Sequence, residues 1–206
     1  MLKKRCKITF IVHGSTIYTA ENRFYEVGEY PPLDDNGRDE IERLTSWLKK
    51  RSPKTDRIYT APTLRAMQSA SIISKSYEQS FEVLDDLTSK NEGIWSGLAF
   101  CEIEEKYPDL LDKYHKDCEN FKSKNGESVK EFNERSIKIV EKIKEKDFGK
   151  RVIIVCDAPF IRAIMSSCFG IPCSNQNRIS LQTGSATQIN FYENWPVLVY
   201  TNYYQL

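Results

Sequence analysis

Two short runs of consecutive apolar, β-branched residues constrain the fold of this chain more than any other feature. They are ITFIV at 8–12 and RVIIVC at 151–156. A strand covered by helices on both faces needs apolar side chains on consecutive residues, whereas a strand with one wet face alternates apolar and polar residues. Both runs are much shorter than a membrane span. The pattern therefore predicts two inner strands of a mainly parallel sheet.

Helical segments separate these strands, as the crossovers of a parallel sheet require. Apolar residues recur at helical spacing in three segments: 37–50, 62–77 and 127–146. A fourth helix is predicted over 159–170. Pro62 is expected at the first position of the helix over 62–77. The weaker strand candidates are 57–60 and 81–84, with a hairpin over 186–192 and 196–201. This order predicts an α/β fold, a three-layer α/β/α sandwich with a mainly parallel central sheet and helices on both faces.

The length of 206 residues favours a single domain over 1–206. Residues 86–126 differ from the rest because they are charged, aromatic and poor in strand patterns. We expect them to form a cap-like helical insertion over one end of the sheet. The C-terminal segment PVLVYTNYYQL could form a sheet edge that pairs with a second copy, so a homodimer stays open.

Charge and cysteine usage exclude several classes of function. Thirty Lys and Arg side chains nearly balance 29 Asp and Glu, so no overall field recruits nucleic acid or an anionic membrane. Any anion site must therefore be local. The six cysteines form no Cys-x-x-Cys pair and there are two histidines, so we expect no metal site. These features favour a reduced, cytoplasmic protein.

Three turns between a strand and the following helix carry residues suited to chemistry. In α/β sheets such turns lie beyond the carboxyl ends of the strands, where ligands bind. The turns place His13 after the first strand, Arg65 in the first turn of a helix, and Asp157 at the end of a later strand. Each residue alone also has a structural explanation, since a strand-end histidine can bond a carbonyl and a first-turn arginine can be a surface charge.

Taken together, six segments in the right order carry a family resemblance over nearly the whole chain. They are VHGSTIYTAENRF (12–24), PPLDDNGRDEIERLTSWL (31–48), RIYTAPTLRAMQSASII (57–73), LTSKNEGIWSGL (87–98), GESVKEFNERSIKIV (126–140) and VIIVCDAPFIRAIM (152–165). The chain resembles the histidine phosphatase superfamily, which includes cofactor-dependent phosphoglycerate mutases and related acid phosphatases. The resemblance implies that the 86–126 insertion covers the active-site end.

The resemblance also implies a phosphohistidine mechanism that needs no metal or cofactor. In this family a first histidine attacks phosphorus, two arginines and a second histidine hold the phosphate oxygens, and an acid protonates the leaving oxygen. Such positioning and cationic stabilisation suit a phosphoryl group, whose negative charge is spread over its oxygens. This chain keeps the family residues at four positions: His13, Gly14, Thr16 and Arg65.

Other positions depart from the family pattern. The arginine before the first histidine is Val12, the asparagine six residues after it is Thr19, the acid is Ser89, and the second histidine is Asp157. Four other carboxylates could replace the acid if the loop shifts: Glu92, Asp85, Asp86 and Glu102. The candidate catalytic residues are thus His13, Asp157 and Ser89. The candidate substrate-binding residues are Arg65, Gly14, Thr16, Thr19 and Val12.

The departures predict a large loss of phosphatase activity. Removing one preorganised donor to a transition state costs about 2.7–4 kcal/mol, so losing an arginine and a histidine predicts a rate deficit on the order of 10⁴ or more. Asp157 would also repel a phosphate dianion. We expect it to pair with His13, which favours the imidazolium form, or with Arg65, where it acts as a built-in anion.

Two functions remain open beside that of a purely structural subunit, for which the sequence offers no particular surface. The first is a protein of this fold that lacks normal phosphatase or mutase turnover and binds a small metabolite or a partner. Its ligand would be a small anion or another small molecule suited to a remodelled pocket. The alternative is an active but atypical phosphomonoesterase in which His13 still accepts the phosphoryl group, or a remodelled pocket that carries out another reaction.

Overall fold

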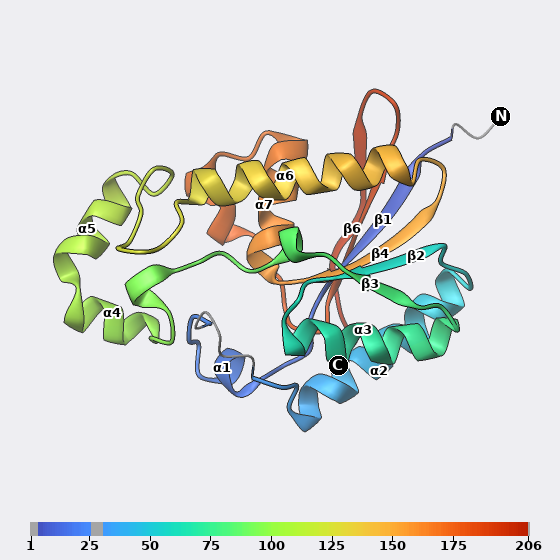
Figure 1. Cartoon of the computed structure of the whole chain (residues 1–206), viewed down its shortest axis with the longest axis horizontal. Coiled ribbons are helices and arrows are strands. Elements are labelled where there is room, and N and C mark those ends of the chain that lie inside the picture. Colours follow the sequence, from blue (N-terminus) through green and yellow to red (C-terminus); the bar gives the residue numbers. More distant parts are fainter. Residues whose placement is uncertain (1–3, 26–30, 206) are drawn as a thin grey trace.

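The computed structural model describes residues 4–25 and 31–205, and these form a six-stranded mixed sheet with helices on both sides (Figure 1). The strand order is β3-β2-β4-β1-β5-β6. The first four strands in this order run parallel, and β5 and β6 are antiparallel to their neighbours. The strands are β1 Cys6–Val12, β2 Arg57–Thr60, β3 Phe81–Val83, β4 Arg151–Cys156, β5 Ala186–Phe191 and β6 Pro196–Tyr203. The predicted mainly parallel sheet is confirmed.

The two apolar runs form the inner strands, as predicted. β4 lies between β2 and β1, and its residues from Val152 to Cys156 are all buried. Alternate side chains of these strands point to opposite faces, so both faces of the sheet need apolar cover. Helices α2 Asp35–Arg51 and α3 Leu64–Tyr77 lie on one side of the strands in Figure 1, and α6 Val129–Lys146 and α7 Ala158–Phe169 lie on the other. The predicted three-layer sandwich is therefore confirmed.

Polar side chains set the starts of the long helices. Asp34 accepts a hydrogen bond from the Gly37 amide at the start of α2, and Ser128 forms a capping box with Glu131 at the start of α6. The expected helical position of Pro62 is wrong, because α3 begins two residues later at Leu64. The Ala61 amide still donates to the carbonyl of Val155 in β4 (3.0 Å), which keeps the chain extended past the end of β2.

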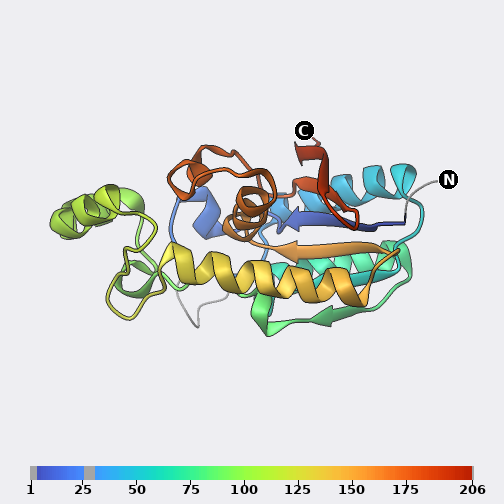
Figure 2. The same ribbon diagram turned by 90° about the horizontal axis from the view of Figure 1, so that it is seen from above.

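The 86–126 segment contains short helices and extends the molecule at one end. Its elements include η2 Gly93–Trp95, α4 Phe100–Lys106 and α5 Pro108–Lys116, preceded by η1 Asp85–Leu87. Figures 1 and 2 place α4 and α5 beyond the end toward which the arrows of β1 and β4 point. The segment has a small core of its own, made by Trp95, Ile103 and Leu111. That it forms one domain with the sheet stays a prediction.

The remaining elements are α1 Ile17–Ala20, which follows β1, and η3 Cys173–Arg178, which follows α7. β5 and β6 form the predicted hairpin, and β6 is an edge strand of the sheet, as suggested for the C-terminal segment. Its pairing with a second copy stays a prediction. Among the described residues, no helix is both long and apolar enough to cross a membrane.

Candidate functional site at the carboxyl ends of β1 and β4

His13 and Asp157 meet because their strands are parallel neighbours in register. Val12 ends β1 opposite Cys156, which ends β4, so the next residue of each strand lies at the same edge of the sheet. The His13 amide donates to the Cys156 carbonyl (3.2 Å) and extends this pairing by one residue. Arg65 reaches the same edge from the first turn of α3. The sheet thus brings together the three side chains that the sequence singled out.

The carboxylate of Asp157 binds His13 and Arg65 at the same time. His13 Nε2 lies 2.8 Å from Asp157 Oδ1. Arg65 Nε donates to Oδ1 (3.0 Å) and Arg65 Nη2 donates to Oδ2 (2.9 Å), which is a bidentate pair. The sequence had suggested one pairing or the other, and the structure contains both. All three side chains are buried, with 1% of Arg65, 2% of His13 and 4% of Asp157 exposed.

This arrangement keeps Asp157 ionised. Burial by itself raises the pKa of the Asp157 carboxyl, but the charge of Arg65 and the hydrogen bond from His13 outweigh it, so the pKa lies well below its usual range. The other ring nitrogen of His13, Nδ1, lies 2.7 Å from the Gly14 carbonyl oxygen. Both ring nitrogens therefore face acceptors. The carboxylate of Asp157 therefore occupies the Nε2 side of the ring, opposite the nitrogen that contacts the Gly14 carbonyl.

Ser89 completes the group around the carboxylate. Its hydroxyl donates to Asp157 Oδ2 and accepts from Arg65 Nη2 (2.8 Å). Ser89 is placed by Arg135 of α6, which donates to the carbonyls of Asp86, Thr88 and Ser89 at 2.9–3.2 Å and pairs with Glu127 (2.7 Å). The GES…R segment of the sequence therefore holds the loop that carries Ser89.

Tyr25 is a site residue that the sequence reasoning missed. The Arg65 guanidinium carbon lies 3.4 Å from the centroid of its ring, and the ring meets His13 edge-on at 5.7 Å. Its hydroxyl lies 3.1 Å from Thr16 Oγ1, and burial raises the pKa of the phenol to about 12. Tyr25 sits one residue beyond the motif ENRF, and no periodic signal marks it. Its ring and the Asp157 carboxylate together cover Arg65.

Gly14, Thr16 and Thr19 shape the turn after β1. A Cβ on Gly14 would lie 2.2 Å from the Gly37 carbonyl oxygen, so only glycine fits against the start of α2. Thr16 caps α1, accepting from the Thr19 amide, while Thr19 Oγ1 accepts from the Thr16 amide (2.8 Å). Gly14 and Thr16 therefore hold the backbone in place, and Thr19 also lines the cavity beside His13.

That cavity has a volume of about 220 Å³ and lies between the turn after β1, the start of α7 and the Ser89 loop. Val12, His13, Thr19, Ser89 and Asp157 line it, and Arg65 is not among its lining residues. Most of the other lining side chains are apolar or hydroxylic: Phe24, Tyr25, Ala158, Pro159, Leu181 and Thr183. Val12 and Ser89, two of the positions that depart from the family pattern, thus face the cavity, while Arg65 is hidden behind Asp157.

Of the four carboxylates that could replace the acid, Glu92 lines the cavity. Burial raises its pKa above the ordinary value, although Lys90 at 2.6 Å opposes this. Glu102 instead caps α4 and pairs with Arg23 (2.5 Å), while Asp85 and Asp86 are exposed in η1. Among the described residues, no three His, Cys, Asp or Glu side chains gather as a metal site would require.

Comparison with known proteins decides the family. A profile of the histidine phosphatase superfamily (branch 1) matches residues 8–203. The chain belongs to this superfamily. It is 24% identical to phosphoserine phosphatase 1 of Hydrogenobacter thermophilus over 190 residues, covering 89% of this chain and 88% of the relative. It is 26% identical to phosphoglycerate mutase-like protein 4 of Arabidopsis thaliana, covering 77% of this chain and 69% of the relative.

A solved histidine phosphatase shows the same fold. It is a phosphoserine phosphatase of Entamoeba histolytica in complex with 3-phosphoglyceric acid, with a TM-score of 0.84 at 19% identity, covering 97% of this chain and 98% of that one. At this level of identity the likeness establishes the fold. The superfamily resemblance predicted from the six segments is confirmed. The roles of individual residues at this site stay predictions.

Proposed function

We propose that this histidine phosphatase superfamily protein binds a small molecule in the cavity beside His13 and turns over phosphate monoesters at most very slowly. The observation that supports the proposal is that the Asp157 carboxylate contacts both His13 (2.8 Å) and Arg65 (2.9 Å). A bidentate carboxylate occupies the guanidinium edge that would otherwise receive phosphate oxygens. The protein therefore supplies its own anion where a substrate anion is needed.

Electrostatics oppose a phosphate dianion at this place. The pKa of Asp157 lies below its usual range, so the carboxylate is ionised at neutral pH. Two unit charges of like sign 4 Å apart repel by about 4 kcal/mol at an effective dielectric constant of about 20. Neither of the two lining cations outside this group is free, because Arg23 pairs with Glu102 and Lys90 pairs with Glu92. A dianion would thus meet repulsion without a compensating cation.

The lining favours a small, largely uncharged ligand. Apolar contact comes from Val12, Leu181 and Pro159, and hydroxyl groups from Thr19 and Thr183 lie among them. A cavity of about 220 Å³ is larger than one of about 150 Å³ that holds benzene, so it suits a small metabolite rather than a nucleotide. A small anionic ligand is the less favoured form of the proposal, because the anion would have to displace Asp157 from Arg65.

One observation favours the alternative of an atypical phosphomonoesterase. Glu92 lines the cavity, and burial raises its pKa, so it is suited to donate a proton to a leaving oxygen. His13 also faces the cavity. This reaction would require Asp157 to release both His13 and Arg65 before phosphate could bind, and the proposal of slow turnover follows from that requirement.

A phosphatase assay separates the two functions. The substrates are p-nitrophenyl phosphate and 3-phosphoglycerate, and the proteins are wild type, His13→Ala and the double variant Val12→Arg with Asp157→His. We expect wild type to be no faster than His13→Ala. The double variant restores two side chains that donate hydrogen bonds to phosphate, and restoring even one of them predicts a gain in kcat of about 10²-fold. Wild-type turnover that disappears in His13→Ala, or an acid-labile phosphoprotein, would instead establish the atypical enzyme.

A further inference from the structure

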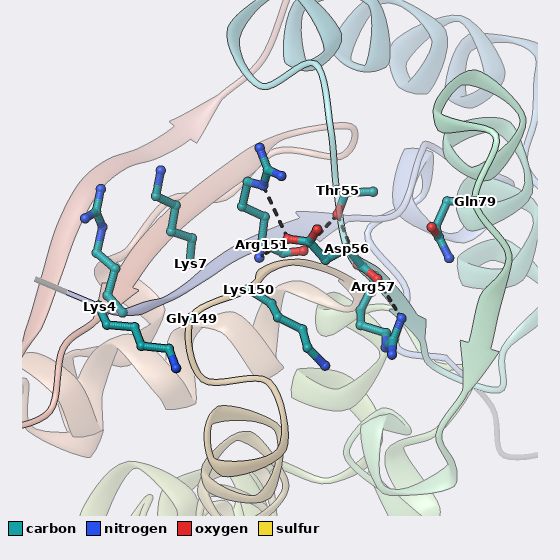
Figure 3. A pocket seen from close by; sticks show the side chains of 10 residues that line it. Lys4, Lys7, Thr55, Asp56, Arg57, Gln79, Gly149, Lys150 and Arg151 are labelled. Atoms are coloured by element: carbon teal, nitrogen blue, oxygen red, sulfur yellow. Dashed lines mark hydrogen bonds and ion pairs between the residues drawn. The ribbon is translucent and has the colours of Figure 1, made fainter. Parts of the chain in front are cut away.

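A second hollow lies at the opposite end of the sheet, where β1, β4 and β2 begin. Its lining comes from the chain before and within these three strands, including Lys7, Arg57 and Arg151, and from Gln79 just before β3 (Figure 3). His13 lies six residues further along β1 than Lys7, and a strand rises about 3.3 Å per residue, which puts the two sites about 20 Å apart. This basic groove, as we call it, has a volume of about 710 Å³.

Positive charge gathers in the basic groove although the chain as a whole is nearly neutral. The cationic lining side chains are Lys4, Arg5, Lys7, Arg57, Lys150 and Arg151. Two carboxylates accompany them: Asp56, which bonds Arg151 (3.3 Å), and the buried Asp147, which bonds Lys150 (2.8 Å). Figure 3 shows Lys4 and Lys7 at one end of the groove, Arg151 with Asp56 in the middle and Arg57 at the other end.

Lys7 is a cation of the groove that has no ion-pair partner among the described residues. It is half-buried and lies opposite Arg151 in the parallel pairing of β1 with β4. Burial lowers its pKa, and the charges of Arg5 and Arg151 lower it further. Within the part of the chain that the structure describes, Lys7 forms no ion pair. An anion placed between Lys7 and Arg151 would relieve this repulsion.

The spacing of the cations indicates a ligand with more than one anionic group. β4 separates β1 from β2, and neighbouring strands lie about 4.8 Å apart, so the backbones that carry Lys7 and Arg57 are about 10 Å apart. Lys7 pairs with Arg151 and Arg57 pairs with the next residue of β4, so the side chains of Lys7 and Arg57 point to opposite faces of the sheet and one phosphate does not meet both. A neighbouring hollow of about 470 Å³ shares Arg5, Lys7 and Arg151 and adds Arg51, which lengthens the cationic surface. Guanidinium groups bind phosphate oxygens in pairs, so a chain of phosphates matches the groove.

The lining also argues against nucleic acid as the ligand. Single-stranded nucleic acid is held by aromatic side chains on which bases stack. The described residues that line the basic groove include no aromatic side chain. The neighbouring hollow has two half-buried tyrosines that already have other contacts, because the Tyr77 hydroxyl donates to the Ser52 carbonyl and the Tyr200 ring packs edge-on against Trp47. We propose that the basic groove binds a small polyphosphorylated molecule, recognised through its phosphate chain, independently of the cavity beside His13.

Isothermal titration calorimetry with sodium tripolyphosphate tests the proposal. The groove variant is Lys4→Gln with Lys7→Gln, and the matched control is Lys113→Gln with Lys116→Gln, which removes the same charge from exposed positions of α5. We expect wild type and the control to bind alike, and the groove variant to bind about 10- to 100-fold more weakly. Equal affinity of all three proteins, or equal weakening in both variants, would overturn the proposal. Thermal unfolding of each variant checks that it is folded.

Further titrations identify what is recognised. A nucleoside triphosphate that binds as tightly as tripolyphosphate, at 50 and at 150 mM salt, supports recognition of the phosphate chain. The nucleoside triphosphate could instead bind more tightly than tripolyphosphate, with the groove variant binding both ligands more weakly than wild type. That result supports binding of the phosphate chain in the groove together with an additional contact to the nucleoside. An oligothymidine of 12 nucleotides that binds tightly while tripolyphosphate does not would overturn the proposal in favour of a nucleic-acid surface. Screening by salt weakens every charge-based interaction, so the ranking is compared at a fixed salt concentration.

Discussion

Asp157 is a buried carboxylate that contacts a guanidinium, an imidazole and a hydroxyl group at the same time. It is also the N-cap residue of α7, yet its side chain makes no capping bond to that helix. Its oxygens are instead committed to His13, Arg65 and Ser89. Removing one partner of a buried ion pair leaves the other charge uncompensated, which is more costly than never having had the pair. Single substitutions here should therefore change both stability and anion binding.

Asp157→Asn should destabilise the fold and create a phosphate site. The amide keeps the shape but removes the charge that balances Arg65, and the loss of one partner from a buried pair costs about 3–5 kcal/mol. Inorganic phosphate can then displace the neutral amide from Arg65 and restore part of the stability, by about 2.7 kcal/mol at 100 times its Kd. Urea unfolding with and without phosphate measures both effects.

The matched control is Asp112→Asn, which removes a carboxylate from an exposed position of α5. Surface substitutions of this kind usually change stability by less than about 0.5 kcal/mol. We expect no phosphate effect on this control beyond that seen for wild type. If phosphate stabilised wild type as much as it stabilised the Asp157→Asn variant, Asp157 would not be excluding the anion.

The Asp157 pair also predicts how stability depends on pH. The pKa of Asp157 is lower in the folded than in the unfolded protein, so its stabilising contribution is complete above the unfolded value, about 3.9. It is lost as pH falls below that value toward the folded pKa. The difference in the free energy of unfolding between wild type and Asp157→Asn should be constant from pH 7 to pH 5 and shrink below pH 4. A difference that grew on acidification would contradict an ionised Asp157.

At the scale of elements, the turn after β1 is fixed by the contact of two glycines. Gly14 lies against Gly37 at the start of α2, and a Cβ on either would come within 2.2 Å of a backbone oxygen of the other segment. The Gly14 amide donates to Ser69 Oγ of α3 (3.2 Å), so the turn also touches a second helix. The position of His13 therefore depends on close packing of backbone against backbone.

Gly14→Ala should be far more damaging than an equally conservative change elsewhere. The added methyl group meets backbone atoms that cannot rotate away. Overpacking usually lowers the free energy of unfolding by about 1–3 kcal/mol, and we expect Gly14→Ala to lower it by about 3 kcal/mol or more. Gly170→Ala is the control, because Gly170 has a φ of +66° and no atom lies within 4 Å of the place that a Cβ would take. Left-handed strain alone predicts a loss of about 1–2 kcal/mol there. Equal losses in the two variants, measured by urea unfolding, would show that the Gly14 contact is not tight.

At the scale of the whole molecule, the sequence predicted the sheet because its inner strands must be apolar on both faces. ITFIV and RVIIVC became β1 and β4, and helices fill the predicted segments between them. Strand ends and turn residues also placed His13, Arg65 and Asp157 correctly, since parallel strands bring their carboxyl ends to one edge. These features follow from local pattern and from topology.

Long-range side-chain contacts could not be predicted in the same way. Nothing in the local sequence of Tyr25 shows that its ring covers Arg65, and the double pairing of Asp157 depends on the position of α3 relative to β4. The basic groove was also missed, because its cations come from three distant segments that each carry an ordinary surface charge. Overall neutrality of the chain had suggested only that an anion site would be local.

The 86–126 segment and the sheet have cores of very different size. In the segment Trp95, Ile103 and Leu111 are buried together, with partly buried aromatic residues around them. The sheet and its helices share one large core that includes every described residue of β4 from Val152 onward. Local opening is easiest where few apolar side chains are buried. We therefore expect α4 and α5 to open without unfolding of the sheet.

Hydrogen exchange followed by mass spectrometry tests this expectation. Amides of α4 and α5 should exchange faster than those of β1 and β4, whose exchange requires global unfolding. Ile103→Ala removes a fully buried side chain from the small core and should speed exchange in α4 and α5 while leaving β4 unchanged. Ile154→Ala, a matched truncation of a fully buried side chain in β4, should speed exchange in both regions, because the segment also unfolds whenever the sheet does. If Ile103→Ala changed β4 as much as α4, the segment and the sheet would form one cooperative unit, as expected of a single domain that unfolds in one step.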